Sequence, residues 1–239
     1  MTIHETLAAD AHGEKAIERQ SVYVYEAPVR IWHWVNAFCI LTLALTGYLI
    51  GAPLPAVPGE ASANFLMGYI RFTHFAAGQV LAVFLILRVY WAIVGNVHAR
   101  QIFYVPIWSR GFWSEWLHEV KWYTFIARQP KKYVGHNPLA QFTMFFMVTL
   151  PLFFMVITGF ALYSEGAGRD SWEYSLSGWV FSIWPNSQDI HTFHHLGMWV
   201  ILVFVMVHIY VAVREDIMSR QSIISSMISG ERLFKDRED

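Results

Sequence analysis

Charged residues are scarce in this sequence. Asp, Glu, Lys and Arg together make up 15% of its 239 residues, whereas hydrophobic residues make up 55%. An ordinary soluble domain carries about 25% charged residues, and its surface helices show a polar face every few residues. The composition therefore argues against a soluble helical protein and predicts an integral membrane protein.

Cysteine is nearly absent as well. Cys39 is the only one, which excludes a disulfide within the chain, a cluster held by several cysteines, and covalent attachment of haem through a C-x-x-C-H motif. Any haem in this protein would be held non-covalently, as a b-type centre. We interpret Cys39 itself as a packing residue.

Long apolar runs are what the sequence has in abundance. Four runs are long enough to cross a hydrocarbon layer about 30 Å thick, and Arg88 is the one charged residue within them. Pro151 inside the third run predicts a kink. The expected fold is therefore all-α, an integral membrane four-helix bundle with spans at residues 31–51, 73–94, 141–163 and 195–213.

Basic residues gather in alternate connections. Three precede the first run, six lie in the 95–138 connection and five follow the fourth run, whereas residues 52–70 hold none. The positive-inside rule then places both termini of this multi-pass protein in the cytoplasm. The first twenty residues lack the apolar segment of a cleavable signal. We expect residues 1–20 to form a mobile cytoplasmic tail and residues 21–239 to form the membrane domain.

The 95–138 connection combines apolar residues at near-helical spacing with charged residues. This pattern predicts an amphipathic helix that lies at the cytoplasmic membrane surface. Such a helix could bind a partner or only cap the bundle, and both interpretations stay open. The apolar residues are Phe112, Trp113, Trp116, Leu117, Val120 and Phe125, and the charged ones are Arg110, Glu115, Glu119, Lys121 and Arg128.

Four histidines lie in these runs at two depths. His194, just before the fourth run, and His208 are fourteen residues apart, which in a helix is a rise of about 21 Å and a rotation of about four turns. Both side chains therefore share one face. With the termini inside, His33 matches the cytoplasmic depth of His208, and His74 matches the outer depth of His194. Each pair can hold one haem iron from opposite sides, which gives six-coordinate centres suited to electron transfer.

Two neighbouring histidines compete with His194 for the outer position. His191 and His195 are rotated by about 100° and 140° from the face of His208, against about 40° for His194. His194 is therefore the expected ligand. The other two are either solvated or orient the ligand from behind.

A short Thr-Gly motif occurs in both the first and the third run. Thr46-Gly47-Tyr48 and Thr158-Gly159-Phe160 lie near the outer ends of these runs. Gly47 is fourteen residues beyond His33, so it shares that histidine's face at the outer depth. The glycine would allow either a flat macrocycle near the backbone or close helix packing.

Three arginines lie near the predicted haem depths. Arg88 is fourteen residues past His74, on the same face and at the inner depth, where it could neutralise a haem propionate. Arg71 at the outer mouth could do the same or reach the headgroups. For Arg30 at the inner mouth we prefer the headgroup interpretation.

Five segments of the sequence carry a family resemblance. They are YVYEAPVRIWHWVNA (23–37), GEASANFLMGYIRFTHF (59–75), YVGHNPLAQ (133–141), QDIHTFHHLGMW (188–199) and REDIMSRQSIISSMISG (214–230). In these segments the chain resembles the b-type cytochrome subunit of membrane-bound nickel-iron hydrogenases, and its histidine spacing also resembles the gamma subunit of membrane formate dehydrogenase. The resemblance implies a two-haem subunit of the bacterial inner membrane that anchors a periplasmic hydrogenase and reduces membrane quinone. His33, His74, His194 and His208 fall at the family's ligand positions.

The resemblance also implies quinone reduction where the chain enters the third span. His136 and Asn137 lie there, and both could hydrogen-bond quinone oxygens, while His136 could relay a proton. The simpler interpretation is that Asn137-Pro138 only starts a helix. The outer loops, rich in Trp and acidic residues, could meet the hydrogenase small and large subunits or form an interfacial aromatic belt.

The leading hypothesis is thus a di-haem cytochrome b that takes electrons from a periplasmic nickel-iron hydrogenase and passes them across the membrane to quinone. The chain carries no hydrogen-activating site of its own, and no nucleic-acid partner is expected. The alternative is the haem subunit of a formate dehydrogenase or a stand-alone b-type cytochrome. A transporter or sensor with proton- or metal-binding histidines would need them at one midplane site, whereas these lie at two depths.

Overall fold

The computed structural model describes residues 20–55, 58–219 and 221–234. Within these residues four helices are long and apolar enough to cross a membrane. They are α1 (Ala27–Gly51), α2 (Leu66–Val94), the composite helix Pro138–Ala167, and α8 (Ser187–Met218). The predicted all-α membrane bundle is confirmed. The mobile tail predicted for residues 1–20 lies outside the described residues, apart from Gln20, the first residue of β1.

The composite third helix changes its winding just before Pro151. It consists of α4 (Pro138–Met144), a π-helical turn η2 (Phe145–Thr149) and α5 (Leu150–Ala167). Proline has no N–H to donate to the preceding turn, and a wider turn is one way in which a helix absorbs this defect. The structure thus has a π-helical turn just before Pro151, and the kink predicted there stays a prediction.

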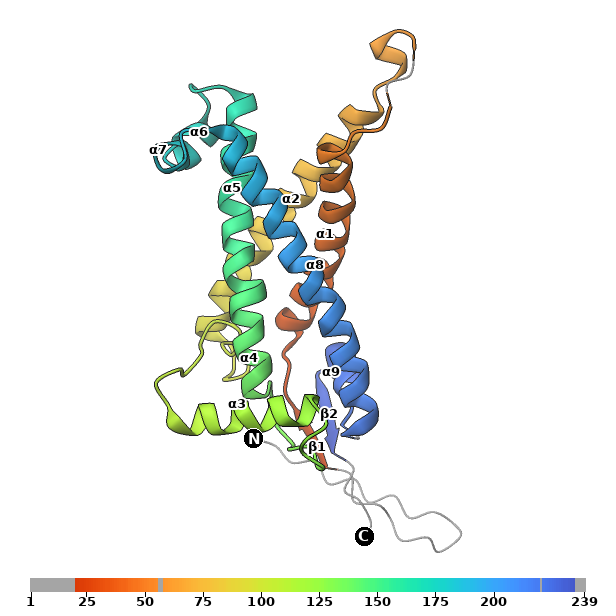
Figure 1. The fold of residues 1–239 in the computed structure, drawn as a ribbon, viewed down its shortest axis with the longest axis vertical. Coiled ribbons are helices and arrows are strands. Elements are labelled where there is room, and N and C mark those ends of the chain that lie inside the picture. The colour runs from red at the N-terminus through yellow and green to blue at the C-terminus, as the bar shows by residue number, and fades with distance from the viewer. Residues whose placement is uncertain (1–19, 56–57, 220, 235–239) are drawn as a thin grey trace, which may run out of the picture. The chain divides into compact units, whose positions relative to one another are not determined.

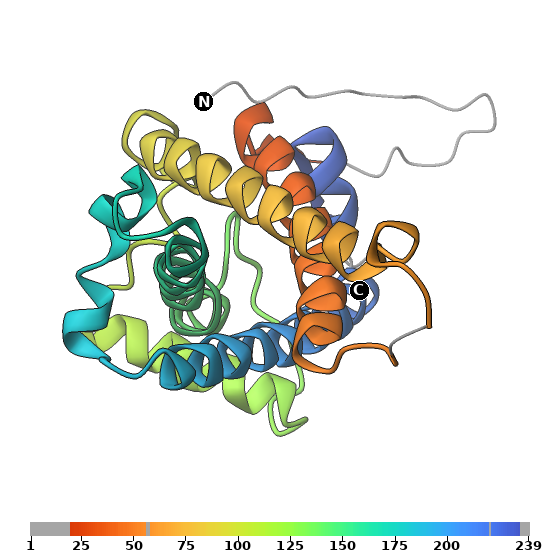
Figure 2. The ribbon, with the colours of Figure 1, turned by 90° about the horizontal axis from the view of Figure 1, so that it is seen from above.

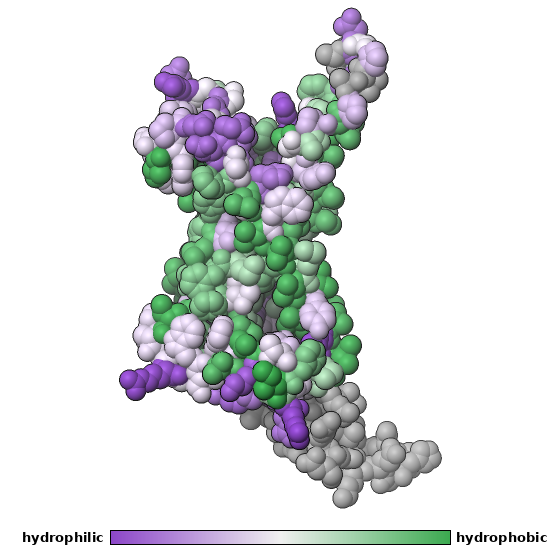
Figure 3. All heavy atoms as spheres, viewed as in Figure 1, coloured by the Kyte–Doolittle hydropathy of each residue, from purple (hydrophilic) through white to green (hydrophobic). Residues whose placement is uncertain are grey.

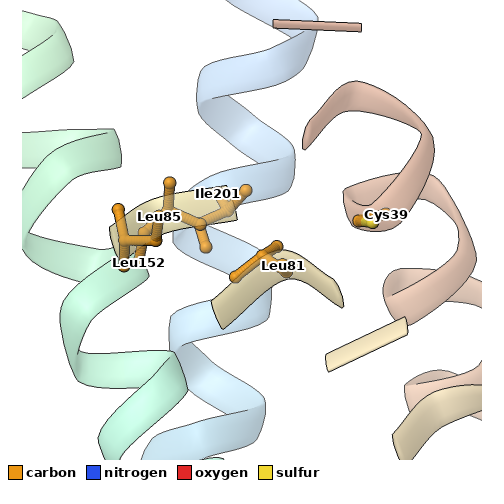
Figure 4. Close-up of a cluster of buried hydrophobic side chains, with 5 residues drawn as sticks. All are labelled: Cys39, Leu81, Leu85, Leu152 and Ile201. Carbon is orange, nitrogen blue, oxygen red and sulfur yellow. The ribbon is translucent and has the colours of Figure 1, made fainter. Parts of the chain in front are cut away.

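The chain divides into two compact units, and residues 32–89 and 146–205 form one of them. All four long helices contribute to its apolar core, which supports the interpretation of Cys39 as a packing residue (Figure 4). The connection from α5 to α8 forms two short helices, α6 (Trp172–Ser177) and α7 (Val180–Ile183), which contact α5. Figure 2 views α5 nearly along its axis, with α2 and α8 passing on either side. The core residues are Cys39, Leu81, Leu85, Leu152 and Ile201.

The other unit contains residues 90–145, 206–239 and those before 32. Its described part includes a small antiparallel sheet that the sequence reasoning did not anticipate. Strand β1 (Gln20–Tyr23) pairs with β2 (Glu231–Phe234), with Gln20 opposite Phe234 and Tyr23 opposite Glu231. The short helix α9 (Ile223–Ser229) precedes β2 and packs on it. The two ends of the described chain therefore meet in one sheet.

Helix α3 (Arg110–Tyr123) confirms the helix predicted in the 95–138 connection. The Ser109 hydroxyl accepts a hydrogen bond from the Phe112 N–H and caps its first turn. Figure 1 shows α3 running across the end of α4, and the two helices are in contact. Phe125, predicted to belong to the apolar stripe, lies beyond the helix in a left-handed conformation and is exposed.

The other end of α3 is anchored to the last turns of α8. The Trp122 indole donates a hydrogen bond of 2.6 Å to the Glu215 carboxylate. Arg214 pairs with the same carboxylate at 2.9 Å, and both of these charged residues are buried. A charge removed from water is tolerated when it is paired in this way. The contact holds α3 in place by polar as well as apolar interactions.

Large apolar side chains point outward along the long helices. Phe38, Phe72, Ile86 and Ile93 are all more than two-thirds exposed. On the face seen in Figure 3, hydrophobic residues cover the long helices and hydrophilic residues gather around α6. Exposed apolar surface on this scale is unusual for a soluble protein and is what a lipid-facing surface requires.

Candidate haem site

His74 on α2 and His194 on α8 face each other within one compact unit. Their ring centroids lie 6.5 Å apart, with an angle of 67° between the ring planes. Metal–imidazole bonds are about 2 Å long and the ring centroid lies roughly 1 Å behind the nitrogen, so a bis-histidine iron separates the centroids by about 6 Å. The spacing of this predicted pair therefore fits one iron between two imidazoles.

Each of the two histidines is hydrogen-bonded by a threonine from a neighbouring helix. The Oγ1 atom of Thr46 on α1 lies 2.9 Å from Nδ1 of His74. The Oγ1 atom of Thr158 on α5 lies 2.8 Å from Nδ1 of His194. With Nδ1 engaged, Nε2 is the nitrogen of each ring that would be available to a metal. This donor set fits a haem iron held by two neutral imidazoles.

A glycine follows each of these threonines and lies against the same histidine. A Cβ atom added at Gly47 would lie 3.1 Å from Cε1 of His74, and one added at Gly159 would lie 3.3 Å from Cε1 of His194. Both distances are shorter than ordinary van der Waals contact. Close packing explains these glycines, and the group that they admit is the histidine ring.

The two competing histidines face elsewhere. His191 is exposed, and its Nδ1 lies 3.0 Å from the Ser187 carbonyl oxygen of its own helix. His195 packs beside Gly51 and Trp199. Neither lies in the ring contact that joins His74 to His194, as the helical rotation predicted.

The second predicted pair is divided between the two units. His33 belongs to the unit of residues 32–89 and 146–205, where it is half-buried and packs edge-on against Trp34. His208 belongs to the other unit and is also half-buried. The pairing of these two histidines stays a prediction.

The three arginines have different surroundings. Arg88 is 2% exposed, and its guanidinium carbon lies 5.4 Å from the centroid of the Trp32 ring, within the range of a cation–π contact. Arg71 is exposed. Arg30 donates a hydrogen bond to the Ile228 carbonyl. Its guanidinium therefore has a partner within the protein, whereas headgroup contact had been preferred.

The predicted quinone residues are both engaged within the protein. Asn137 caps α4, because its Oδ1 accepts a hydrogen bond of 2.7 Å from the Ala140 N–H. The Nδ1 of His136 lies 3.1 Å from the Gln101 side-chain oxygen, and its Nε2 lies 3.5 Å from the Tyr25 hydroxyl. The helix-start interpretation of Asn137 is confirmed, and the quinone role of both residues stays a prediction.

Beside Asn137 lies a buried carboxyl group that the sequence reasoning placed among the charged residues of the amphipathic helix. Glu119 is 2% exposed, and its Oε2 accepts a hydrogen bond of 3.0 Å from the Asn137 amide. Burial raises the pKa of Glu119 to about 7, against the lowering effect of the Tyr133 hydroxyl and with a smaller rise from Glu215. The Tyr133 hydroxyl also donates to Glu115, at 2.8 Å. The expectation that Glu119 belongs to the polar face of the amphipathic helix is wrong, because its side chain is buried where α3 meets α4.

A membrane bundle in which two intramembrane histidines lie at the spacing of iron ligands is the arrangement expected of a non-covalent haem protein. Residues 24–230 match the family model described as prokaryotic cytochrome b561. The chain belongs to this family, and it is a b-type cytochrome that binds haem b. This membership favours the cytochrome hypothesis over the transporter or sensor hypothesis.

Similar curated proteins match almost the whole chain. A probable Ni/Fe-hydrogenase B-type cytochrome subunit of Rhizobium leguminosarum bv. viciae is 91% identical over 239 residues, all of both chains. A protein of the same name from Azotobacter vinelandii is 58% identical over 99% of this chain and 98% of its own. A probable Ni/Fe-hydrogenase 1 B-type cytochrome subunit of Escherichia coli (strain K12) is 49% identical over 90% of this chain and 92% of its own. The resemblance drawn from the sequence is confirmed.

Proposed function

We propose that this protein is a di-haem cytochrome b that takes electrons from a periplasmic nickel-iron hydrogenase and delivers them to membrane quinone. The observation that carries the proposal is the His74–His194 contact. Two intramembrane imidazoles at the spacing of a bis-histidine iron, each hydrogen-bonded at Nδ1, are suited to a low-spin centre that transfers electrons without binding oxygen.

The second haem is proposed at His33 and His208. His208 lies fourteen residues past His194 on α8, on the same helix face, and polar residues at this depth of a span need a partner. Arg88 would neutralise a propionate of this inner haem, with Trp32 fixing its guanidinium. Arg71 would serve a propionate of the outer haem.

The charge distribution supports the proposed sidedness. The basic residues of the 95–138 connection and of both terminal stretches favour a cytoplasmic location for the unit that contains α3, α9 and the small sheet, in the inner membrane. The His74–His194 site would then lie near the periplasm. The connection with α6 and α7 would lie on the side of the hydrogenase small and large subunits. The names of the relatives favour hydrogenase over formate dehydrogenase as the partner.

When bound, the haem groups supply reversible one-electron transfer. Hydrogen oxidised outside releases two electrons and two protons, and quinone takes up two electrons together with two protons from the cytoplasm. His136 and Asn137 would hold the quinone oxygens. To do so they would exchange contacts with Gln101, Tyr25 and Glu119 for contacts with the ligand.

The decisive experiment is a reduced-minus-oxidised visible spectrum of the purified chain, with haem quantified per polypeptide. Two b-type haems in the wild type and one in His194→Ala support the proposal. One haem in the wild type would remove the inner site from it, and unchanged haem content in His194→Ala would remove the outer site.

The partner and the acceptor need the intact complex. Membranes that contain the hydrogenase and this chain should reduce the b-type haem with hydrogen, and a soluble quinone should re-oxidise it. Haem that hydrogen cannot reduce in the presence of active hydrogenase would contradict the assignment of the donor. Haem that is reduced by hydrogen but is not oxidised by quinone would contradict only the assignment of the acceptor.

A further inference from the structure

The threonines of the two Thr-Gly motifs, Thr46 and Thr158, make the same pair of contacts at His74 and His194. Thr46 Oγ1 lies 2.6 Å from the Thr42 carbonyl oxygen and 2.9 Å from His74 Nδ1. Thr158 Oγ1 lies 2.7 Å from the Phe154 carbonyl oxygen and 2.8 Å from His194 Nδ1. Each hydroxyl thus joins a backbone carbonyl one turn back in its own helix to an imidazole on another helix.

The proton positions follow from these contacts. A hydroxyl group has a single hydrogen to donate, and a carbonyl oxygen can only accept. The hydrogen therefore points to the carbonyl, and the hydroxyl oxygen accepts the N–H at Nδ1 of the histidine. The opposite arrangement would bring two oxygens to 2.6 or 2.7 Å without a hydrogen between them.

We infer that Thr46 and Thr158 are positioning residues that hold His74 and His194 in the Nδ1–H tautomer, with Nε2 as the nitrogen that binds the outer haem iron. The inference rests on the outer haem site of the proposed function. Partners of this kind fix the tautomer and ring orientation of a metal ligand and raise its basicity. A more basic ligand stabilises ferric over ferrous iron, so the two hydroxyls also lower the potential of this haem.

The glycines that follow the two threonines leave space for the histidine rings. Gly47 and Gly159 come directly after the threonines, and a Cβ atom added at either position would lie within 3.3 Å of a histidine Cε1 atom. Each imidazole therefore packs along a Thr-Gly step of a neighbouring helix. The threonine supplies the hydrogen-bond acceptor, and the glycine supplies the space for the ring. This explains why the Thr-Gly motif occurs twice in the sequence: each copy positions one histidine ring.

The test uses side chains of equal shape with and without the hydroxyl. Thr46→Val and Thr158→Val keep the volume and remove the acceptor, whereas Thr46→Ser and Thr158→Ser keep the acceptor. We expect each valine variant to bind the outer haem about tenfold more weakly or worse, and the haem that remains to titrate at a higher midpoint potential. The serine variants should restore the wild-type potential.

Two further threonines provide matched controls. Thr73 and Thr192 bond the carbonyls of Tyr69 and Gln188 in their own helices, at 2.8 and 2.9 Å, and each lies within two residues of one of the histidines. Their valine variants remove the same kind of helix hydrogen bond next to the site. They should leave haem content and potential unchanged.

The outcomes separate this inference from the proposal beneath it. Wild-type haem affinity and potential in Thr46→Val and Thr158→Val would overturn the inference, as would equal losses in the serine variants. If His194→Ala loses one haem while the threonine variants are normal, the outer site stands and only the positioning role fails. If His194→Ala keeps its full haem content, the proposed site itself fails.

Discussion

The imidazoles of His74 on α2 and His194 on α8 lie with their ring centroids 6.5 Å apart, although the two residues are more than one hundred positions apart along the chain. Neither ring is held by its own helix alone, since Thr46 and Thr158 approach from α1 and α5. The site therefore uses all four long helices. A change in any one of them should be visible in the haem.

Removal of a ligand should distinguish the four histidines of this region. His74→Ala and His194→Ala should each lose the outer haem completely, because one remaining imidazole cannot hold six-coordinate iron. His191→Ala and His195→Ala should keep it, since both rings face away from the contact. Haem per chain, measured on detergent-purified protein, checks this. Loss of haem in His195→Ala with retention in His194→Ala would reassign the ligand.

An added methyl group should disturb the site through sterics alone. Gly47→Ala places a Cβ atom 3.1 Å from the His74 ring, and Gly159→Ala places one 3.3 Å from the His194 ring. Each ring must move by a few tenths of an ångström, so outer-haem affinity should fall several-fold, and more for Gly47→Ala than for Gly159→Ala.

The matched control for these glycines is Gly166→Ala. Gly166 lies in α5 with open space around the position of an added Cβ atom, and alanine is the better helix former by about 1 kcal/mol. Haem content should be unchanged there, with equal or higher thermal stability. Normal haem binding in Gly47→Ala would show that the close contact is not a constraint.

Stability should fall as the pH rises from about 4.5 to about 7 because of Glu119. The pKa of Glu119 is raised to about 7 in the folded protein, mainly by burial. The folded state thus holds a proton that the unfolded chain releases above its ordinary pKa of 4.5, and the free energy of unfolding decreases through this window. Glu119→Gln removes the titration, so it should flatten this slope and raise stability at pH 8 by up to about 3 kcal/mol.

Thermal unfolding in detergent between pH 4.5 and 8 measures the Glu119 effect. Glu115→Gln is the comparison, because hydrogen bonds from Lys131 and Tyr133 lower the pKa of Glu115 and remove its titration from this window. It should keep most of the slope. An unchanged slope in Glu119→Gln would mean that another group is responsible.

Asn137 offers a way to separate a structural from a quinone-binding role. Asn137→Ala removes the cap of α4 and should cost about 1 kcal/mol of stability. Asn137→Ser restores the cap with a hydroxyl but lacks the amide that bonds Glu119. If Asn137 binds quinone, hydrogen-dependent quinone reduction should fall in both variants while haem reduction by hydrogen stays normal. Full quinone activity in Asn137→Ser would leave capping as its function.

Much of the candidate site could be read from residue spacing. The fourteen-residue interval and the charge distribution identified His74 and His194 as a pair and rejected His191, because helical rotation is a local property of the chain. The repeated Thr-Gly motif was also visible in the sequence, but the contacts that it makes were not. From the sequence, Gly47 suits a nearby macrocycle or close helix packing, and only the structure shows that the His74 ring lies against it.

Two other features of the structure could not be predicted from the sequence. Glu119 has the spacing of a surface carboxyl, and it is buried because Asn137 and α4 cover it from another part of the chain. The pairing of β1 with β2 joins residues more than two hundred positions apart. Neither strand carries an alternating pattern long enough to indicate a sheet.

The four membrane spans and their apolar surfaces follow from the sequence alone, because the cost of placing each residue in hydrocarbon is additive along a helix and needs no knowledge of neighbours. The proton on each histidine, the space for each ring and the burial of Glu119 were decided by tertiary structure. Each depends on where a hydroxyl, a missing Cβ atom or an amide from a distant segment comes to lie. Hydrogen bonds and steric contacts act over a few ångströms, so only the packed helices determine them.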